Sequence, residues 1–206
     1  YQNIALMNLK DFSTRDLTTD GKSGDAMWSK DGKHVYFISS ISGTPQLYCS
    51  DATGKAEKLT DYELGISAPV LSPDNRYVAF TANVFPEAGA DGKKNVELQK
   101  KLDNGPVQAH IADKLLYRHW TEYADGKYQH IIVYDLNDKT YTDVTPGEWL
   151  SPVFMPGGGV GFNFSPFRKY ICFVSIRPEH QDSNTNCNLW TVPVKGGEVN
   201  FLTSQH

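Results

Sequence analysis

A hairpin pattern that occurs three times constrains the fold of this chain more than any other feature. Each copy reads as an apolar residue, a serine, a short polar turn and an alternating apolar strand. The copies lie at Met27–Ser40, Val70–Thr81 and Asn163–Ser175. The first copy turns at Asp31 and Gly32, a pair typical of hairpins because glycine adopts positive φ without a steric penalty. The recurrence predicts equivalent structural units.

Two further landmarks follow each hairpin. The first is an aromatic residue on an apolar strand, and the second is a threonine that follows an apolar residue: Tyr48 and Thr60, Tyr134 and Thr145, and Trp190 and Thr203. Their separations are 12, 11 and 13 residues. Ser29 and Ser72 are 43 residues apart, within the range of four-stranded propeller blades. Leu17 and Thr18 repeat the last landmark near the start of the chain.

These repeats predict an all-β fold, namely a partial β-propeller of about three and a half four-stranded antiparallel blades with a short helical insertion. The predicted division is the end of a blade at 1–20, a blade at 24–60, a blade at 66–145 that is interrupted at 84–127, and a blade at 151–206. Propellers close with about 4–8 blades, so we expect a fragment of a ring. Its open blade edges predict self-association, because unpaired strand edges attract other chains.

The interruption at 84–127 predicts a segment that is either functional or disordered, because long excursions from a compact domain are uncommon. Its apolar spacing predicts short helices at Val96–Leu102 and Gln108–Leu116. Elsewhere, the repeated serines (Ser29, Ser72 and Ser165) are expected to cap turns through their hydroxyls. The large apolar residues of the repeats are expected in the core: Trp28, Phe37, Phe80, Phe164 and Phe173.

Composition excludes several classes of partner. The net charge of −4 and pI near 5.8 predict no nucleic-acid partner, and no apolar run is long enough to predict a membrane span. His110, His119 and His130 lie 9 and 11 residues apart, which is not a metal-ligand spacing. With three cysteines, one disulfide bond is possible. Cys49 and Cys172 are expected in strands, where a cysteine usually acts as a small apolar core residue. We therefore expect no metal and no cofactor.

The segment Asp182–Asn186 begins like a calcium-binding loop, but the positions that require glycine and glutamate hold Cys187 and Pro193. We therefore expect a solvated turn between strands there.

The hairpins at Trp28–Lys33 and Ser72–Arg76 resemble a propeller repeat shared by two groups of proteins. One is the prolyl oligopeptidase family of serine peptidases, which carry an N-terminal propeller, and the other is the propeller protein of the Tol system. The segment Tyr117–Glu122, followed by Ile132–Asn137, resembles more narrowly the dipeptidyl peptidase and acylaminoacyl-peptidase branches of the peptidase family. In those branches an Arg-His pair on the propeller precedes a strand that ends in Tyr-Asp-Leu.

This resemblance implies the propeller portion of an exported, periplasmic or secreted serine exopeptidase. Such enzymes release dipeptides or blocked residues from peptide N-termini, and an α/β-hydrolase domain follows the propeller in sequence. The implied partners are therefore that C-terminal domain and a peptide substrate. The chain has no Gly-x-Ser-x-Gly nucleophile motif, so it contains no predicted catalytic residue and should be inactive alone. The alternative is a stand-alone periplasmic binding or scaffold propeller like that of the Tol system.

The resemblance also implies a substrate-binding set in the insertion. Arg118 corresponds to the arginine that donates to a substrate carbonyl, a task suited to a guanidinium because its charge and donor geometry are fixed. Glu122 is a candidate for a free peptide ammonium. His119 and Trp120 complete the set by packing beside them. The alternative for Arg118 is a surface ion pair with a neighbour such as Asp113.

Overall fold

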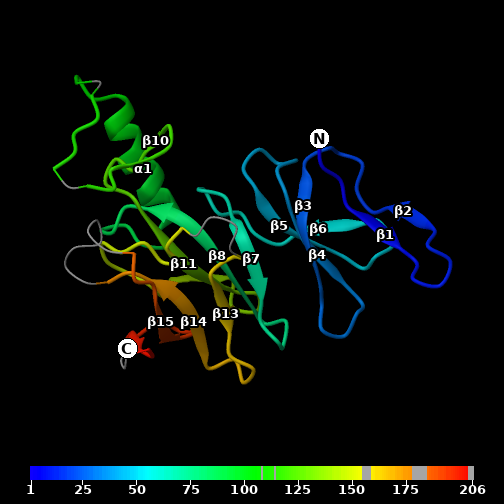
Figure 1. The fold of residues 1–206 in the computed structure, drawn as a ribbon. Helices are drawn as coiled ribbons and strands as arrows, with labels where there is room; N and C mark the ends of the chain where they lie inside the picture. Colours follow the sequence, from blue (N-terminus) through cyan, green and yellow to red (C-terminus); the bar gives the residue numbers. More distant parts are fainter. Residues whose placement is uncertain (108, 114, 155–158, 178–184, 204–206) are drawn as a thin grey trace.

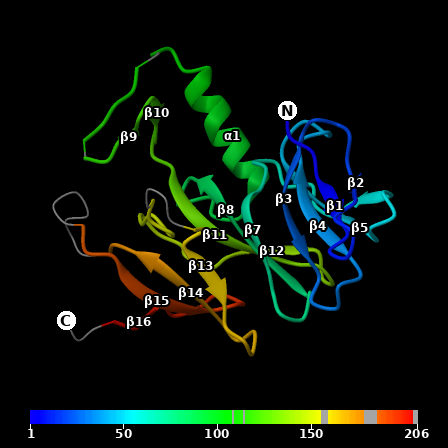
Figure 2. The same cartoon turned by 45° about the vertical axis from the view of Figure 1, so that its right-hand side comes forward.

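Three four-stranded antiparallel sheets follow one another along an arc, preceded by a two-stranded pair (Figures 1 and 2). The computed structural model describes residues 1–107, 109–113, 115–154, 159–177 and 185–203. Each sheet is a meander of sequential strands, and the arc is open. The predicted all-β, partial propeller fold is therefore confirmed. No helix in the described ranges has the length and apolar character needed to cross a membrane.

The strands follow the repeat order of the sequence. The two-stranded pair contains β1 (Ala5–Met7) and β2 (Thr14–Asp16). The first sheet contains β3 (Ser23–Trp28), β4 (Val35–Ser39), β5 (Gln46–Ser50) and β6 (Ala56–Lys58). The second contains β7 (Ser67–Leu71), β8 (Tyr77–Val84), β11 (Tyr128–Asp135) and β12 (Thr140–Asp143). The third contains β13 (Phe162–Phe164), β14 (Tyr170–Ser175), β15 (Asn188–Pro193) and β16 (Asn200–Phe201).

The three repeated hairpins join the first and second strands of each sheet and have the same turn. In each, the serine hydroxyl accepts a hydrogen bond from the backbone N–H five residues later: Ser29 from His34 at 2.9 Å, Ser72 from Tyr77 at 2.9 Å and Ser165 from Tyr170 at 3.2 Å. The residue three after the serine is left-handed each time: Gly32, Asn75 and Arg168, with φ of 69°, 59° and 60°. The predicted capping role of the serines is confirmed.

The repeated threonine ties the third strand to the end of the fourth. Its hydroxyl accepts the backbone N–H of a residue near the start of the third strand, in four pairs: Thr18 and Ile4, Thr60 and Leu47, Thr145 and Ile131, and Thr203 and Leu189. These distances run from 2.9 to 3.2 Å. Because Thr18 repeats the contact, β1 and β2 correspond to the two outer strands of a blade.

Each sheet is held by apolar contacts on its faces. The second sheet packs through Val78, Phe80 and Ile132 against Ile38 and Leu47 of the first. Its other face packs through Ile131 and Val133 against the third sheet, where Phe162, Ile171 and Phe173 are buried. A smaller cluster joins the first sheet to the β1–β2 pair through Ile4, Leu17, Val35, Phe37 and Tyr48. Propeller blades stack in this way because neither face can stay exposed.

One expected core residue is not buried. Phe37, Phe80, Phe164 and Phe173 lie in the core as predicted, but 54% of Trp28 is exposed. Trp28 ends β3, the first strand of its sheet, and the neighbouring unit contributes only β1 and β2, which correspond to outer strands. No described first or second strand of a preceding blade therefore covers this side chain.

The insertion leaves the second sheet after β8 and returns at β11. It contains α1 (Gly92–Asp103) and the two-stranded hairpin β9 (Arg118–His119) and β10 (Glu122–Tyr123), both beyond the same end of the sheet (Figures 1 and 2). The predicted helix at Val96–Leu102 is confirmed. It starts earlier than expected because the carboxylate of Asp91 accepts the N–H of Lys94 and caps it.

The second predicted helix is wrong. No described residue of the Gln108–Leu116 segment is helical. Gly105 and Pro106 follow the end of α1, and Pro106 lacks the N–H that would continue a helical ladder. The side chains of Ile111 and Leu115 are 86% and 67% exposed, so they do not pack against another part of the described structure. A short amphipathic helix needs such packing to form.

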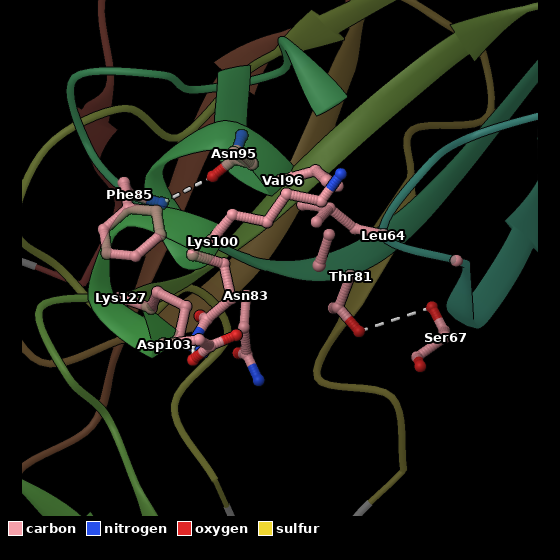
Figure 3. Close-up of a pocket in the computed structure, with 13 residues that line it drawn as sticks. Leu64, Ser67, Thr81, Asn83, Phe85, Asn95, Val96, Lys100, Asp103 and Lys127 are labelled. Carbon is pink, nitrogen blue, oxygen red and sulfur yellow. Dashed lines mark hydrogen bonds between the residues drawn. The ribbon is translucent and has the colours of Figure 1, made fainter. Parts of the chain in front are cut away.

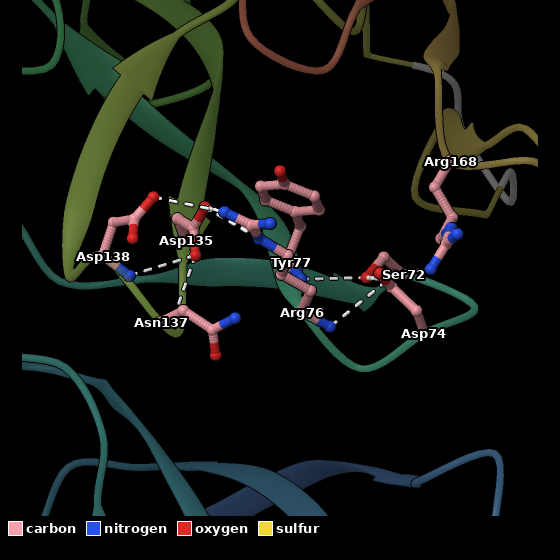
Figure 4. Close-up of polar contacts among 8 residues, drawn as sticks. All are labelled: Ser72, Asp74, Arg76, Tyr77, Asp135, Asn137, Asp138 and Arg168. Carbon is pink, nitrogen blue, oxygen red and sulfur yellow. Dashed lines mark hydrogen bonds and ion pairs between the residues drawn. The ribbon is translucent and has the colours of Figure 1, made fainter.

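A buried carboxylate joins two turns of the second sheet (Figure 4). Asp135, at the end of β11, accepts hydrogen bonds from Nε and Nη2 of Arg76 at 3.1 and 2.8 Å. Its other oxygen accepts the N–H groups of Asn137 and Asp138. Burial by itself would raise the pKa of Asp135, but these hydrogen bonds outweigh it and hold the pKa below its usual value. Asp135 therefore closes the β11–β12 turn.

A second set of contacts links neighbouring sheets at their hairpin tips. Nη1 of Arg168 in the third sheet lies 2.7 Å from Oδ2 of Asp74 in the second (Figure 4). Oδ1 of Asn75 in the second sheet accepts the N–H of Lys30 in the first at 3.3 Å. The turns of the three sheets thus form one polar row along a single side of the arc.

The cysteines are all free thiols, so no disulfide joins them. Cys49 and Cys172 lie in β5 and β14 as expected, and both are half-buried. Burial raises the pKa of both thiols and keeps them protonated at neutral pH.

Replacing Thr145 with alanine should destabilise the fold by about 1–3 kcal/mol, because the buried N–H of Ile131 would lose its acceptor. Thr145→Ser should keep most of the stability, since it keeps the hydroxyl. Urea denaturation of the two variants measures the difference. Thr203→Ala, at a less buried site, should cost less, and an equal loss at both sites would contradict this ranking.

The Asp135→Asn variant should lose stability at pH 7 and converge with the parent protein in acid. A native pKa below the unfolded value of about 3.9 stabilises the fold above that pH, and this contribution disappears as pH falls through the native pKa. Thermal unfolding from pH 7 down to pH 2 tests this. A stability difference that stayed constant over this range would assign the loss to packing instead.

Candidate functional site

The insertion at the end of β8 carries the residues with the greatest functional interest. Asn95 fixes it to the sheet: its side-chain oxygen accepts the N–H of Phe85 at 2.8 Å, and its amide donates to the carbonyls of Gly89 and Asp91. Asn95 is 1% exposed. The first turn of α1 is therefore rigidly attached to the second sheet.

The register of the β9–β10 hairpin decides which candidate residues share a face. His119 pairs with Glu122, and Arg118 pairs with Tyr123. Side chains of directly opposite residues lie on the same face, and successive residues alternate. Arg118 and Glu122 therefore project from opposite faces of the ribbon. The sequence prediction gave the two residues different substrate groups, a carbonyl for Arg118 and an ammonium for Glu122, and this register would place those groups on opposite sides of the hairpin.

Aromatic contacts support the hairpin on the Arg118 face. The ring of His110 stacks on Tyr123 with centroids 3.7 Å apart, and Tyr117 lies 6.3 Å from the same ring. Nδ1 of His110 lies 2.7 Å from Oδ1 of Asp125, in the turn that follows β10. The backbone N–H of Ala124 donates to the carbonyl of Tyr117. Sequence reasoning missed this support, although the tyrosines flank the Arg-His pair.

A second aromatic group lies at the hairpin tip. The ring of His119 lies 4.6 Å from Trp120 and 4.5 Å from Phe154, which comes from the segment before the third sheet. Trp120 has a φ of 47°, a conformation that costs a bulky residue about 1–2 kcal/mol. The Trp120 side chain is 78% exposed. The predicted packing partners are therefore together, in an exposed position.

The charge of Arg118 is available on this surface. Among the described residues, Arg118 has no ion pair, so the proposed contact with Asp113 does not form there. The described residues also contain no group of three His, Cys, Asp or Glu side chains that could hold a metal. His130 is fully buried instead, with Nδ1 2.7 Å from Asp143 and Nε2 2.8 Å from the carbonyl of Gly147. The calcium-like segment Asp182–Asn186 lies largely outside the described residues.

A further cation lies on the same side of the propeller. Arg177 follows the end of β14, the strand equivalent to β8. Its guanidinium lies 5.3 to 5.8 Å from the ring centroids of Trp149, Phe173 and Trp190. Burial lowers the pKa of Arg177, and its Nε has no hydrogen-bonding partner in the described structure. The sequence offered no signal for this residue, because its aromatic neighbours come from three separate segments.

Proteins with related sequences are peptidases. The chain is 25% identical over 210 residues to dipeptidyl-peptidase 5 of Arthroderma otae and 29% identical over 202 residues to dipeptidyl-peptidase 5 of Porphyromonas gingivalis. Both alignments cover 94% of this chain. The chain spans 28% of the length of these curated relatives. No protein-family model matches the chain.

Solved structures with the same fold include propellers from proteins with different names. The acylaminoacyl peptidase of Pyrococcus horikoshii matches 97% of this chain and 28% of its own with a TM-score of 0.63 and 15% identity. A TolB-like protein of Agrobacterium tumefaciens matches 97% of this chain and 55% of its own with a TM-score of 0.56 and 16% identity. At these identities the likeness is one of fold.

The predicted resemblance to the propeller region of prolyl oligopeptidase family peptidases is confirmed by these comparisons. The relatives named dipeptidyl-peptidase 5 support the peptidase branch over 94% of the chain.

The His110→Ala variant should loosen the β9–β10 hairpin, because it removes both the stack on Tyr123 and the contact with Asp125. We expect trypsin to cleave after Arg118 several times faster than in the parent protein. Limited proteolysis followed by mass spectrometry measures this. His34→Ala, in the first sheet, is the control, and equal cleavage in both variants would contradict a supporting role for His110.

Proposed function

We propose that this chain is the non-catalytic propeller portion of an exported serine exopeptidase that releases dipeptides or blocked residues from peptide N-termini. The propeller gates access to the active site and positions the substrate. The nucleophile and its partners are supplied by an α/β-hydrolase domain of the same protein, since the chain has no nucleophile motif. A periplasmic or secreted location accompanies this proposal.

The exposed guanidinium of Arg118 is the observation that carries the proposal. It lies on a hairpin supported by stacked rings, in an insertion attached rigidly to the second sheet. Arginine in such a position binds a carbonyl or carboxylate with a charge that does not titrate at working pH. In the proposed role it donates to a substrate carbonyl, while Tyr123 lies on the same face. Glu122 faces the other side, so its proposed role toward a peptide ammonium requires a different part of the substrate.

Exposed apolar side chains on the insertion support a covering partner. Val107, Ile111, Leu115 and Leu116 are between 54% and 86% exposed. A concentration of apolar side chains on a surface is typical of an interaction site. In the proposed enzyme the hydrolase domain packs over this side of the propeller. Self-association through open blade edges is a separate prediction, because it concerns unpaired strand edges and not the apolar side chains of the insertion.

The likeness to the TolB-like propeller favours a second candidate function, a stand-alone binding or scaffold protein. The insertion argues against it, because 43 residues separate β8 from β11 within one blade. A scaffold has no evident need for this excursion. The coding sequence that follows His206 distinguishes the two: a Gly-x-Ser-x-Gly motif within a few hundred residues supports the peptidase.

In the complete protein, Arg118→Ala should lower the specificity constant for dipeptidyl substrates about ten- to a hundredfold. A charged hydrogen bond to a substrate group contributes about 1.5–3 kcal/mol, which corresponds to this range. Steady-state hydrolysis of dipeptidyl amides measures the change. Lys93→Ala on α1 is the control, since it removes a cation from the same insertion. An unchanged Michaelis constant and turnover number for the Arg118 variant would refute a substrate role.

A further inference from the structure

A pocket of about 530 Å³ lies between α1 and the second sheet (Figure 3). The Arg118 hairpin and α1 lie beyond the same end of that sheet (Figure 2). Its walls come from the segment that links the first and second sheets, from the end of β8 and from α1. This volume falls in the range of about 300–1,000 Å³ that is usual for ligand sites. Neither the relatives nor the proposed role of Arg118 assigns it a ligand.

The pocket has a preformed apolar wall. Leu64, Phe85 and Val96 line it, and each comes from a different one of the three contributing segments. Asn95, which also lines it, bonds to Phe85 and so fixes the distance between α1 and the end of β8 (Figure 3). The hydroxyl of Thr81 in β8 donates to the carbonyl of Ser67 at the start of β7, and this bond joins β8 to the end of the segment that links the first and second sheets. The pocket therefore exists without a ligand to order it.

The polar groups at one end of the pocket satisfy one another. Nζ of Lys127 donates to Oε1 of Gln99 at 2.9 Å, and Nε2 of Gln99 donates to Oδ1 of Asp103 at 2.8 Å. Two other polar side chains in the lining, Asn83 and Lys100, are exposed and form no hydrogen bond or ion pair with any described residue. In Figure 3 the Lys100 side chain extends toward Leu64, and Asn83 lies at the other end of the pocket.

We propose that this pocket binds a peptide segment that carries a carboxylate. The carboxylate pairs with Lys100, a backbone amide of the peptide hydrogen-bonds to Asn83, and an apolar side chain packs on the wall formed by Leu64, Phe85 and Val96. Lys100 offers one positive charge and therefore suits a ligand with one negative group. Asn83 lies at the other end of the pocket and offers an amide, so a ligand that reaches both residues must be extended. The proposal rests on the proposed function, in which peptides enter this side of the propeller. The carboxylate is either a free C-terminus or an acidic side chain.

Equilibrium binding of three matched peptides to the complete protein tests this inference. All have the core Ala-Ala-Leu-Ala with the first two peptide bonds N-methylated to prevent hydrolysis. One ends in a free acid, one in an amide, and one in an amide after an added glutamate. Isothermal titration calorimetry at low salt should show the acid binding about three- to tenfold tighter than the plain amide. Recovery of affinity by the glutamate peptide would identify an acidic side chain as an equally good source.

Two lysine variants separate a specific pairing from a general effect of charge. Lys100→Gln should bring the acid to the affinity of the amide, and Lys101→Gln should leave the preference intact. Lys101 is the neighbouring cation on α1, lies outside the pocket and pairs with Glu97 at 2.8 Å. High salt should also shrink the preference, because it screens exposed charges.

The proposal is overturned if none of the peptides binds at millimolar concentration, if acid and amide bind equally, or if Lys100→Gln keeps the preference. Because this experiment measures binding without cleavage, it is independent of the hydrolysis test for Arg118. A protein without peptidase activity that still prefers the acid through Lys100 would refute the proposed function and keep the pocket. If the Arg118 variant loses activity but the protein shows no preference for the acid peptide, the proposed function is kept and the pocket proposal is refuted.

Discussion

Burial of both faces of each sheet is the constraint on which this structure depends. Alternate residues of β11 serve two different cores, since Ile132 packs toward the first sheet and Ile131 toward the third. A four-stranded sheet of this kind has no face that it can leave in water, so its stability comes from its neighbours. The second sheet is covered on both sides and carries the insertion. The candidate site residues of the insertion are therefore attached to the sheet that is packed on both faces.

Polar ties then fix what apolar packing leaves free. Apolar contact is non-directional, so it does not decide where a strand turns or how far the outer strand reaches. The serine hydroxyl sets the turn between the first two strands, and the threonine hydroxyl ties the third strand to the fourth. Both recur in every complete unit. At the strand ends that lie opposite the hairpin turns, the insertion with α1 and the Arg118 hairpin follows β8, and Arg177 follows β14.

The repeats could be predicted from the sequence because each depends on contacts within about 20 residues, as Ser72 and Tyr77 illustrate. The errors have a common physical origin in contacts between distant segments. Trp28 has the composition of a core residue, but its exposure depends on which strands lie beside it. The spacing of Ile111 and Leu115 suits a helix that has no surface to pack on. The motif also makes no statement about strand register, and it is this register that places Arg118 and Glu122 on opposite faces of the hairpin.

The length of the insertion has a consequence for the order of folding. Joining β8 to β11 closes a loop of 43 residues, whereas β4 and β5 are separated by six. For flexible loops this difference costs about 1.7 kcal/mol of chain entropy. The β8–β11 ladder is also the longest described, with eight residue pairs. The hydrogen bonds and packing of this long ladder offset the entropy cost of closing the loop. Because that cost is met only when the loop closes, we expect the second sheet to be completed after the hairpins of the first and third sheets have formed.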